Sequence, residues 1–215
     1  PLQVMSGMLN TLLDINQLEA GIVNPDIMVF PIASLFDRLR TEFGYHAEAK
    51  NLGWRVVESN LHVQSDPRLL EQVIRNLLWN SVKYTPRGKI LLGCRRRGDK
   101  VRIEVWDTGV GIPEEHLQAI FEEFHQVDNA ARERSLGLGL GLAIVQRIAS
   151  MLGHAIDARS RPGKGSVFAV EVPLASEEPP ALVSKHEKTF ETSAAAAGAV
   201  MIVEDDPLVR EMLEL

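Results

Sequence analysis

The chain has few of the features that would place it in several large classes of protein. It contains one cysteine, Cys94, and so can form no internal disulfide, which is typical of proteins in a reducing cytosol. No apolar run approaches the roughly 20 residues of a membrane span, and no signal peptide is visible. We therefore expect a cytoplasmic protein, or the cytoplasmic part of a protein that is anchored in a membrane through segments upstream of this sequence.

Positive charge is also scarce. The 23 Lys and Arg residues are outnumbered by 29 Asp and Glu residues, and the net charge of −6 argues against a nucleic-acid surface. The short basic run 95–97 is typical of a solvated hairpin turn with Gly98 and Asp99. With 215 residues, of which 45% are hydrophobic, the chain is long enough for one good core with appendages.

A helix with a polar arc is the first candidate site. The segment Arg68–Tyr84 has apolar residues at helical spacing, preceded by an expected N-cap at Asp66. These apolar residues are Leu70, Val73, Ile74, Leu77, Leu78 and Val82. A separate, narrow arc carries Gln72, Asn76, Asn80 and Lys83. Asparagine is a weak helix former, so two of them in mid-helix indicate either a use or a solvated polar face.

Two glycine-rich stretches follow in order. The first, Asp107–Pro113, comes after the alternating run Val101–Trp106, so we expect Asp107 at the end of a strand. In the second, glycine stands at positions 137, 139 and 141, and an apolar helix follows. The sequence has no Gly-x-x-x-x-Gly-Lys-[Ser/Thr] loop, yet backbone N–H groups before a helix can still cradle phosphates. Taken singly, the two stretches are also compatible with a capped turn and a flexible connection.

Taken together and in this order, these segments resemble the ATP-binding catalytic domain of sensor histidine kinases, in the GHKL superfamily. The stretch Asn76–Tyr84 is similar to the N box of that family, and Asp107–Pro113 to its first glycine box. Phe121–Phe124 resembles the F box, and Gly137–Gly141 the second glycine box. The resemblance covers roughly residues 25 to 174, and Gly163–Ser166 resembles the turn before the last strand.

The resemblance implies a role for each matching residue, with ATP and Mg²⁺ as cofactors. Asn80 would coordinate Mg²⁺, with Asn76 close to the metal and the phosphates, and both count as catalytic. Lys83 would face phosphate, Tyr84 the sugar or base, and Asp107 the adenine amino group. The other residues expected to line the nucleotide site are Gly109, Gly111, Ile112, Phe124, Gly137, Leu138, Gly139, Leu140, Gly141, Leu142 and Ser166.

The segment 125–136 would form a lid over the nucleotide. Arg132 and Arg134 are candidates to meet phosphate charge there, although solvated charges are the ordinary alternative. Many relatives carry a basic residue two positions after the F box, where this chain has Gln126, so a cationic contact from that position is not expected.

Other members of the superfamily hydrolyse ATP with a glutamate four residues before the metal asparagine. This chain has Asn76 there, and an amide cannot take a proton from water at neutral pH, which favours a kinase over an ATPase. A GHKL-type ATPase or chaperone-like module is one alternative. A degenerate nucleotide-binding dimerisation module, which would not be an enzyme, is the other.

The N-terminal residues predict a dimerisation helix. Apolar or seam residues recur at spacings of three and four, as in a coiled coil, although an ordinary amphipathic helix would have a similar pattern. They are Leu2, Met5, Leu9, Leu12 and Asn16. By resemblance, residues 1–24 are the second helix of the kinase dimerisation domain and support a homodimer. The six histidines lack the surroundings of a phosphoacceptor. We therefore expect a fragment whose acceptor histidine lies upstream and which does not phosphorylate itself.

The C-terminal part changes character. Residues 175–198 have the composition of a linker. The apolar run Val200–Val203 then leads to Glu204 and Asp205, which resemble the first strand and the Mg²⁺-binding acidic pair of a response-regulator receiver domain. A short solvated acidic turn is the alternative. Residues 199–215 would be the start of such a domain, so the partners expected are a receiver in cis or a separate response regulator.

The expected fold class is α+β, a two-layer α/β sandwich with a mixed sheet and helices on one face. Strands are expected near 27–30, 53–57, 88–96, 100–107, 154–159 and 165–173, and helices near 32–49, 67–84, 114–119 and 140–152. The catalytic domain would span residues 25–174. The whole sequence is thus interpreted as part of a hybrid sensor histidine kinase that transfers the γ-phosphoryl group of ATP to a protein histidine.

Overall fold

The computed structural model describes residues 24–125 and 139–175. All of them belong to the first of the two units, Pro1–Ala181, into which the chain divides. Within these described ranges no helix has both the length and the apolar character needed to cross a membrane.

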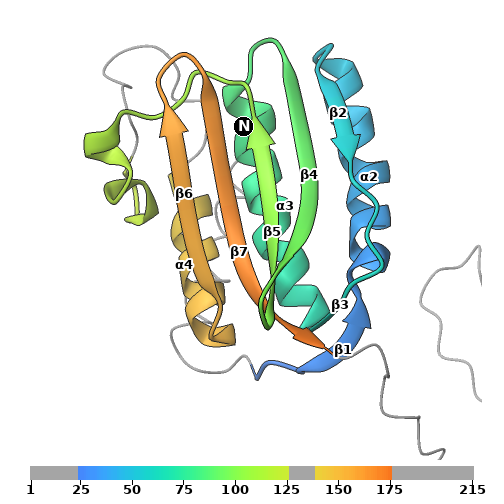
Figure 1. Cartoon of the computed structure of the whole chain (residues 1–215). Coiled ribbons are helices and arrows are strands. Elements are labelled where there is room, and N and C mark those ends of the chain that lie inside the picture. Colours follow the sequence, from blue (N-terminus) through green and yellow to red (C-terminus); the bar gives the residue numbers. More distant parts are fainter. Residues whose placement is uncertain (1–23, 126–138, 176–215) are drawn as a thin grey trace, which may run out of the picture. The chain divides into compact units, whose positions relative to one another are not determined.

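The described residues form one seven-stranded sheet with helices on one of its faces (Figure 1). The strands are β1 (Met28–Pro31), β2 (Gly53–Val56), β3 (His62–Ser65), β4 (Lys89–Arg97), β5 (Lys100–Asp107), β6 (Ala155–Arg161) and β7 (Gly165–Ala175). The helices are α2 (Ile32–Ala49), α3 (Pro67–Tyr84) and α4 (Gly141–Leu152), with 3-10 turns η1 (Glu114–His116) and η2 (Ala119–Phe121).

The sheet is mixed. Its strand order is β1-β3-β7-β5-β4-β2, with β6 also paired to β7. β2 runs parallel to β4, and the other pairs are antiparallel. Because β5 and β7 are long neighbours at the centre, the end of β5 at Asp107 lies directly opposite Ser166, at the start of β7.

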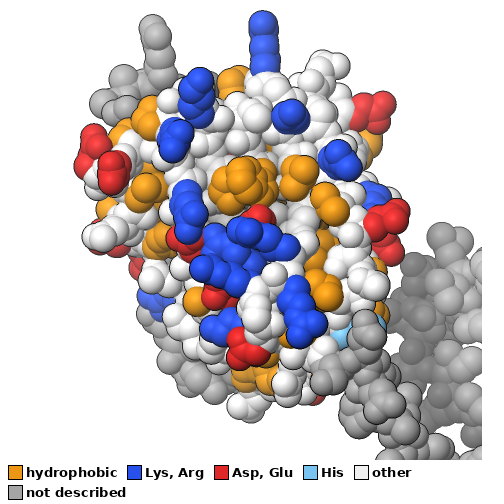
Figure 2. Space-filling model, viewed as in Figure 1, with side chains coloured by type: hydrophobic (Ala, Val, Ile, Leu, Met, Phe, Trp, Pro, Cys, Tyr) orange, Lys and Arg blue, Asp and Glu red, His pale blue; other side chains and the backbone are white. Residues whose placement is uncertain are grey.

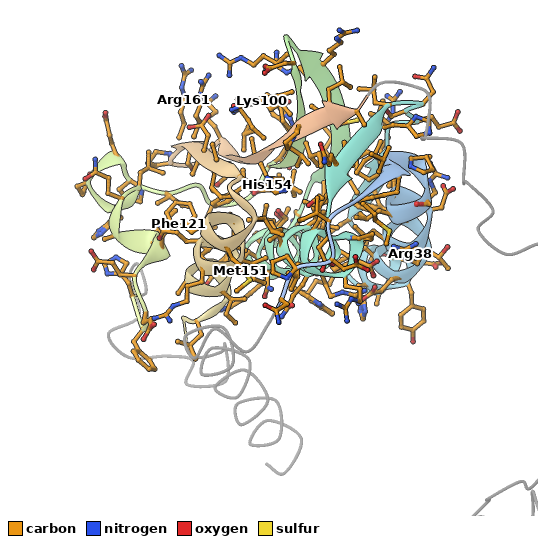
Figure 3. All side chains as sticks on the ribbon, turned by 90° about the horizontal axis from the view of Figure 1, so that it is seen from below. Arg38, Lys100, Phe121, Met151, His154 and Arg161 are labelled. Carbon is orange, nitrogen blue, oxygen red and sulfur yellow. The ribbon has the colours of Figure 1, made fainter. Side chains whose placement is uncertain are left out.

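Alternation along β5 separates the two faces of the sheet. Val101, Ile103 and Val105 are buried and form part of the core with the helices, whereas Arg102, Glu104 and Trp106 alternate with them on the opposite, open face. Figure 3 shows the same division: the labelled side chains of Lys100 and Arg161 lie on the side of the sheet away from the helices.

The helix boundaries follow from local chemistry. The Asp66 side chain caps α3 by accepting hydrogen bonds from the backbone N–H groups of Arg68 and Leu69, at 2.9 and 3.1 Å, and Pro67 occupies the first turn. α4 ends at Gly153, whose φ of 69° is left-handed and is accessible to glycine at little cost. The start of α3 and the end of α4 both agree with the expectations from the sequence.

The two-layer α/β sandwich and its mixed sheet are confirmed, with two differences in detail. β3 was not predicted, because its four residues have no apolar alternation and are held by pairing with β1 and β7. The helix predicted at 114–119 is wrong: this segment contains the 3-10 turn η1 and the start of η2. Such short segments gain little from helix propagation, so their contacts decide their conformation. The dimerisation helix, the linker and the receiver segment lie outside the described residues.

Candidate nucleotide-binding site

α3 buries one face and leaves its polar arc partly exposed. The predicted apolar residues are all buried, and they are joined by Leu69 and by the polar Ser81. Asn76, Asn80 and Lys83 are half-buried on the neighbouring arc. The stripe that packs on the sheet and the stripe that carries the amides are therefore separate, as the sequence predicted.

The two amides face the start of α4. A Cβ atom built on Gly141, the first residue of α4, would lie 3.5 Å from Asn76 Oδ1 and 4.0 Å from Asn80 Oδ1. The Nδ2 group of Asn76 is turned away and donates to the backbone oxygen of Gln72 at 2.9 Å. Two amide oxygens are thus directed at a helix N-terminus that has no side-chain cap, where backbone N–H groups favour an anion.

Asp107 lies at the end of β5, where the Ser81 hydroxyl of α3 contacts it. Its Oδ1 atom accepts from the backbone N–H groups of Gly109, at 2.8 Å, and Ser166, at 3.2 Å. Among the described residues, Oδ2 has only a long contact, with Ser81 Oγ at 3.5 Å. Burial raises the pKa of Asp107 above its ordinary value, although these hydrogen bonds act in the other direction. One carboxylate oxygen is therefore saturated by protein, and the other has capacity to accept a further hydrogen bond.

The first glycine box is shaped by contacts within the protein. A Cβ atom on Gly109 would lie 2.4 Å from the backbone oxygen of Tyr84, at the end of α3. Gly111 has a φ of +72°, and a Cβ atom there would lie 2.1 Å from the backbone oxygen of Arg161. No side chain fits at either position. These glycines bring the turn after β5 against both α3 and the β6–β7 hairpin, a requirement that holds whether or not a ligand is bound.

Other residues that the sequence predicted for the site lie on the same elements as the amides and Asp107, or next to them in sequence. Lys83 Nζ lies 4.5 Å from the ring centre of its neighbour Tyr84, and Tyr84 is exposed. The backbone N–H of Ile112 donates to Ser160 Oγ at 2.7 Å. The Ser166 hydroxyl pairs with Ser160 Oγ at 2.9 Å, so the backbone of Ser166, rather than its side chain, holds Asp107.

The second glycine box lies next to the F box. Gly139 has a φ of +75°, and a Cβ atom on it would lie 3.2 Å from the Phe124 backbone. Phe124 is itself exposed and has a positive φ of 60°. Leu140 is buried, and Leu142 packs against the core. Gly137, Leu138, Arg132, Arg134 and Gln126, together with Glu204 and Asp205, lie outside the described residues.

The sequence did not identify three hydroxyl groups in this region. Ser81 and Thr85 are buried on α3 and at its C-terminal end, and Ser160 on β6 joins Ile112 to Ser166. Ser81 carried a usable signal, because it is a polar residue on the apolar stripe of the helix. The roles of Thr85 and Ser160 depend on neighbours that are distant in sequence.

This fold and this arrangement define the class of the protein: it contains the GHKL-type, ATP-binding catalytic domain of histidine kinases. Residues 65–176 match the family described as histidine kinase-, DNA gyrase B-, and HSP90-like ATPase. The chain belongs to this family.

Relatives that are named as histidine kinases agree with this family assignment. The chain is 30% identical over 204 residues to the circadian input-output histidine kinase CikA of Synechococcus elongatus, covering 93% of this chain and 26% of that protein. It is 35% identical over 174 residues to the signal transduction histidine-protein kinase BarA of Escherichia coli, covering 77% of this chain and 19% of that protein. The chain thus spans about a quarter or less of the length of these relatives.

Two solved structures are also similar to this chain. The crystal structure of full-length ShkA in complex with AMPPNP superposes with a TM-score of 0.69 at 29% identity, over 79% of this chain and 36% of that one. The histidine kinase AdeS of Acinetobacter baumannii has a TM-score of 0.68 over 81% of each chain. At 20% identity, AdeS supports the fold alone.

Proposed function

We propose that this domain binds ATP with Mg²⁺ and presents the γ-phosphoryl group to a histidine of a longer histidine kinase. One observation carries the proposal: neighbouring residues of α3 face opposite ends of one site. Asn80 Oδ1 is directed at Gly141, and Ser81 Oγ at Asp107 Oδ2. Consecutive residues of a helix diverge by about 100°, so α3 separates a phosphate end from a base end.

At the phosphate end, the donor set suits magnesium and phosphate. The Asn76 and Asn80 oxygens are hard, neutral ligands, and Mg²⁺ commonly takes one or two protein oxygens together with water and phosphate oxygens. The uncapped start of α4 offers N–H groups to the phosphates. When bound, Mg²⁺ would neutralise part of the negative charge that develops on the transferred group. Lys83, about one turn beyond Asn80 on α3, would add a positive charge.

At the base end, the unsaturated Oδ2 of Asp107 would accept the exocyclic amino group of adenine. Guanine presents a carbonyl oxygen in the corresponding place, which repels a carboxylate. The exposed ring of Tyr84, beside Lys83, would contact the sugar or base. Gly109 lets the turn after β5 approach the end of α3, and its N–H group holds the carboxylate in place.

Transfer to a protein acceptor is favoured over hydrolysis by position 76. An amide there cannot deprotonate water, and its Nδ2 group is already engaged with the Gln72 oxygen. Phosphoryl transfer to an acceptor requires mainly positioning and electrostatic stabilisation, which this site supplies. We further propose that residues 1–24 mediate a homodimer, and that the phosphoryl group passes to an aspartate of a receiver domain, attached or separate.

Calorimetric titration of the 215-residue chain with ATP, with and without Mg²⁺, tests the proposal. We expect binding that depends on Mg²⁺ and competition by ADP. We also expect no radiolabel from [γ-³²P]ATP on the purified chain and no steady turnover. Absence of heat and of ADP competition would contradict nucleotide binding. Steady hydrolysis that is abolished in Asn76→Ala would favour an ATPase instead.

A further inference from the structure

The open face of the sheet, opposite the helices, is basic in a chain whose net charge is −6. Strand alternation and register place eight basic and three acidic residues of the strands on this face, a net charge of +5. They are Arg55, Lys89, Arg95, Arg97, Lys100, Arg102, Arg159 and Arg161, with Glu104, Asp157 and Glu171. Such segregation of charge attracts an anionic partner to one side of the molecule.

Three of these cations, Arg55, Lys89 and Arg161, have no ion pair with any residue that the structure describes. The other five pair with the three acidic residues, so no carboxylate of the face is left to neutralise the three. The unpaired cations lie on β2, β4 and β6, which are at or near opposite sides of the sheet. Neighbouring strands are about 4.8 Å apart, so the cations spread over about 19 Å.

An apolar row lies among these cations. Leu91, Trp106 and Val167 are direct neighbours on β4, β5 and β7, and Arg55 and Arg159 continue the row on β2 and β6. Trp106 is 45% exposed, and the two aliphatic side chains beside it are half-buried. Figure 2 shows apolar side chains near the centre of this face, with Lys and Arg side chains around them. Packing on the core does not account for a large aromatic ring in this place.

The side chain of Trp106 is fixed and uncovered. Its Nε1 donates to Glu104 Oε2 at 3.2 Å. Gly93 and Gly165, diagonal neighbours on β4 and β7, have no side chain that could cover the ring. Val57 is 36% exposed and extends the apolar area, because a Cβ atom on Gly93 would lie 3.3 Å from its side chain. The face therefore presents an ordered apolar centre surrounded by free positive charge.

We propose that the open face is a peripheral contact surface for an anionic lipid bilayer, in which Trp106 enters the headgroup region and the unpaired cations meet the headgroups. Tryptophan favours the membrane interface, and long basic side chains place their charges among headgroups while their stems cover apolar surface. Mobile headgroups adapt to cations scattered over three strands, whereas an acidic protein needs carboxylates in a matching pattern. A second copy of the chain would set cations against cations, and single-stranded nucleic acid stacks on several aromatic rings rather than one.

Cosedimentation of the 215-residue chain with vesicles tests the proposal. One set of vesicles is phosphatidylcholine alone, and the other is phosphatidylcholine and phosphatidylglycerol in equal parts. We expect binding to the second set only, weakened by added NaCl. The double variant Arg55→Gln/Arg161→Gln should weaken binding about 30-fold, as for two basic residues near an anionic surface. The control Arg40→Gln/Arg68→Gln, at exposed residues of α2 and α3, changes the net charge equally and should stay within about twofold of the wild type.

Trp106→Gln keeps a side-chain donor for Glu104 and should weaken binding about tenfold. It should also remove a shift of tryptophan emission to shorter wavelength that vesicles induce in the wild type. Tyr45→Gln, at an exposed aromatic residue of α2, is the control. No binding to either set of vesicles, or equal weakening by face and control variants, overturns the inference. Binding of oligodeoxythymidine or self-association that is lost in the same variants, without vesicle binding, also overturns it and assigns the face to that partner. Since no arm of the test uses ATP, each outcome is independent of the proposed function.

Discussion

The open face of the sheet and the end of β5 bury acidic groups in opposite ways. On the open face, the guanidinium of Arg102, only 4% exposed, pairs with Glu104, Asp157 and Glu171. Figure 2 views this face, where Lys and Arg side chains are interspersed with acidic ones. At the end of β5, Asp107 has no ion pair with any residue that the structure describes, and its partners are backbone N–H groups and a serine.

The pKa values of Glu104 and Asp107 are shifted in opposite directions, in agreement with this difference. Burial acts to raise the pKa of Glu104, but hydrogen bonds from Arg102, Arg95 and Trp106 outweigh it and lower the pKa below its usual value. Burial raises the pKa of Asp107, and no cation offsets the effect. The Arg102 cluster therefore satisfies its own charges, whereas Asp107 keeps capacity for a donor from outside. This contrast is what we expect if the charges of the Arg102 cluster serve the structure and Asp107 serves binding.

The largest expected effect is the loss of the central cation. Arg102→Met leaves Glu104, Asp157 and Glu171 without their shared partner, and breaking a buried pair typically costs about 3–5 kcal/mol. Urea unfolding at pH 7 measures this change. The control is Arg97→Ala, because Arg97 is an exposed partner of Glu171, where we expect a cost below about 1 kcal/mol. Equal costs for the two variants would remove the distinction between the buried and exposed cations.

His154 shows a third way to bury an ionisable group, in which the group stays neutral. Its Nε2 atom lies 2.8 Å from Ser65 Oγ, and burial lowers its pKa to about 4. The unfolded chain therefore binds this proton at a higher pH than the folded one. The stability that this difference governs is complete above about pH 6.5 and is lost progressively as the pH falls from about 6.5 to about 4, for a total of about 3 kcal/mol.

Unfolding free energies measured from pH 7.5 to 4 check this expectation. His154→Gln should flatten the decline relative to the wild type, because glutamine does not titrate. An identical slope in the two proteins would assign the acid sensitivity to the carboxylates of the Arg102 cluster instead.

The third prediction concerns Asp107 itself. Asp107→Asn should weaken ATP binding about 10- to 100-fold and reduce the preference for adenine over guanine, because the amide no longer offers a charged acceptor. The free variant should be as stable as the wild type or more stable at pH 7. The raised pKa means that the ionised carboxylate is penalised in the folded state above that pKa.

Titration with ATP and GTP, together with urea unfolding, measures both parts. We expect Asp107→Asn to lose affinity for ATP, whereas Arg102→Met should lose stability of the fold. A large loss of stability in Asp107→Asn would place this carboxylate with the structural cluster.

The smallest expected effect is at the amides. Asn80→Ala removes one oxygen directed at the start of α4 and should reduce the enhancement of ATP binding by Mg²⁺ about fivefold. Asn60→Ala, at an exposed residue between β2 and β3, is the matched control. Titrations at several Mg²⁺ concentrations check the change, and an unaltered magnesium dependence would contradict the assigned role of Asn80.

The sequence predicted the long elements and much of the candidate site. The helix 67–84 matches α3 residue by residue because its periodicity, N-cap and proline agree with one another. The strand ending at Asp107 had clear alternation. β3 and the 3-10 turns were not predicted because residues far away in sequence hold them in place. Thr85 and Ser160 were missed for the same reason.

Local pattern alone determined the long helices and strands of this protein, that amides share one arc of α3, and that an acid ends β5. These features depend on spacing and on the intrinsic preferences of each residue, which the chain carries whatever its surroundings. Only the tertiary structure decided which oxygen of Asp107 is saturated, that Asn76 and Asn80 face Gly141, and that the Thr85 hydroxyl has no partner among the residues described. Hydrogen bonding and desolvation depend on neighbours within a few ångströms, and folding brings those neighbours from distant parts of the chain.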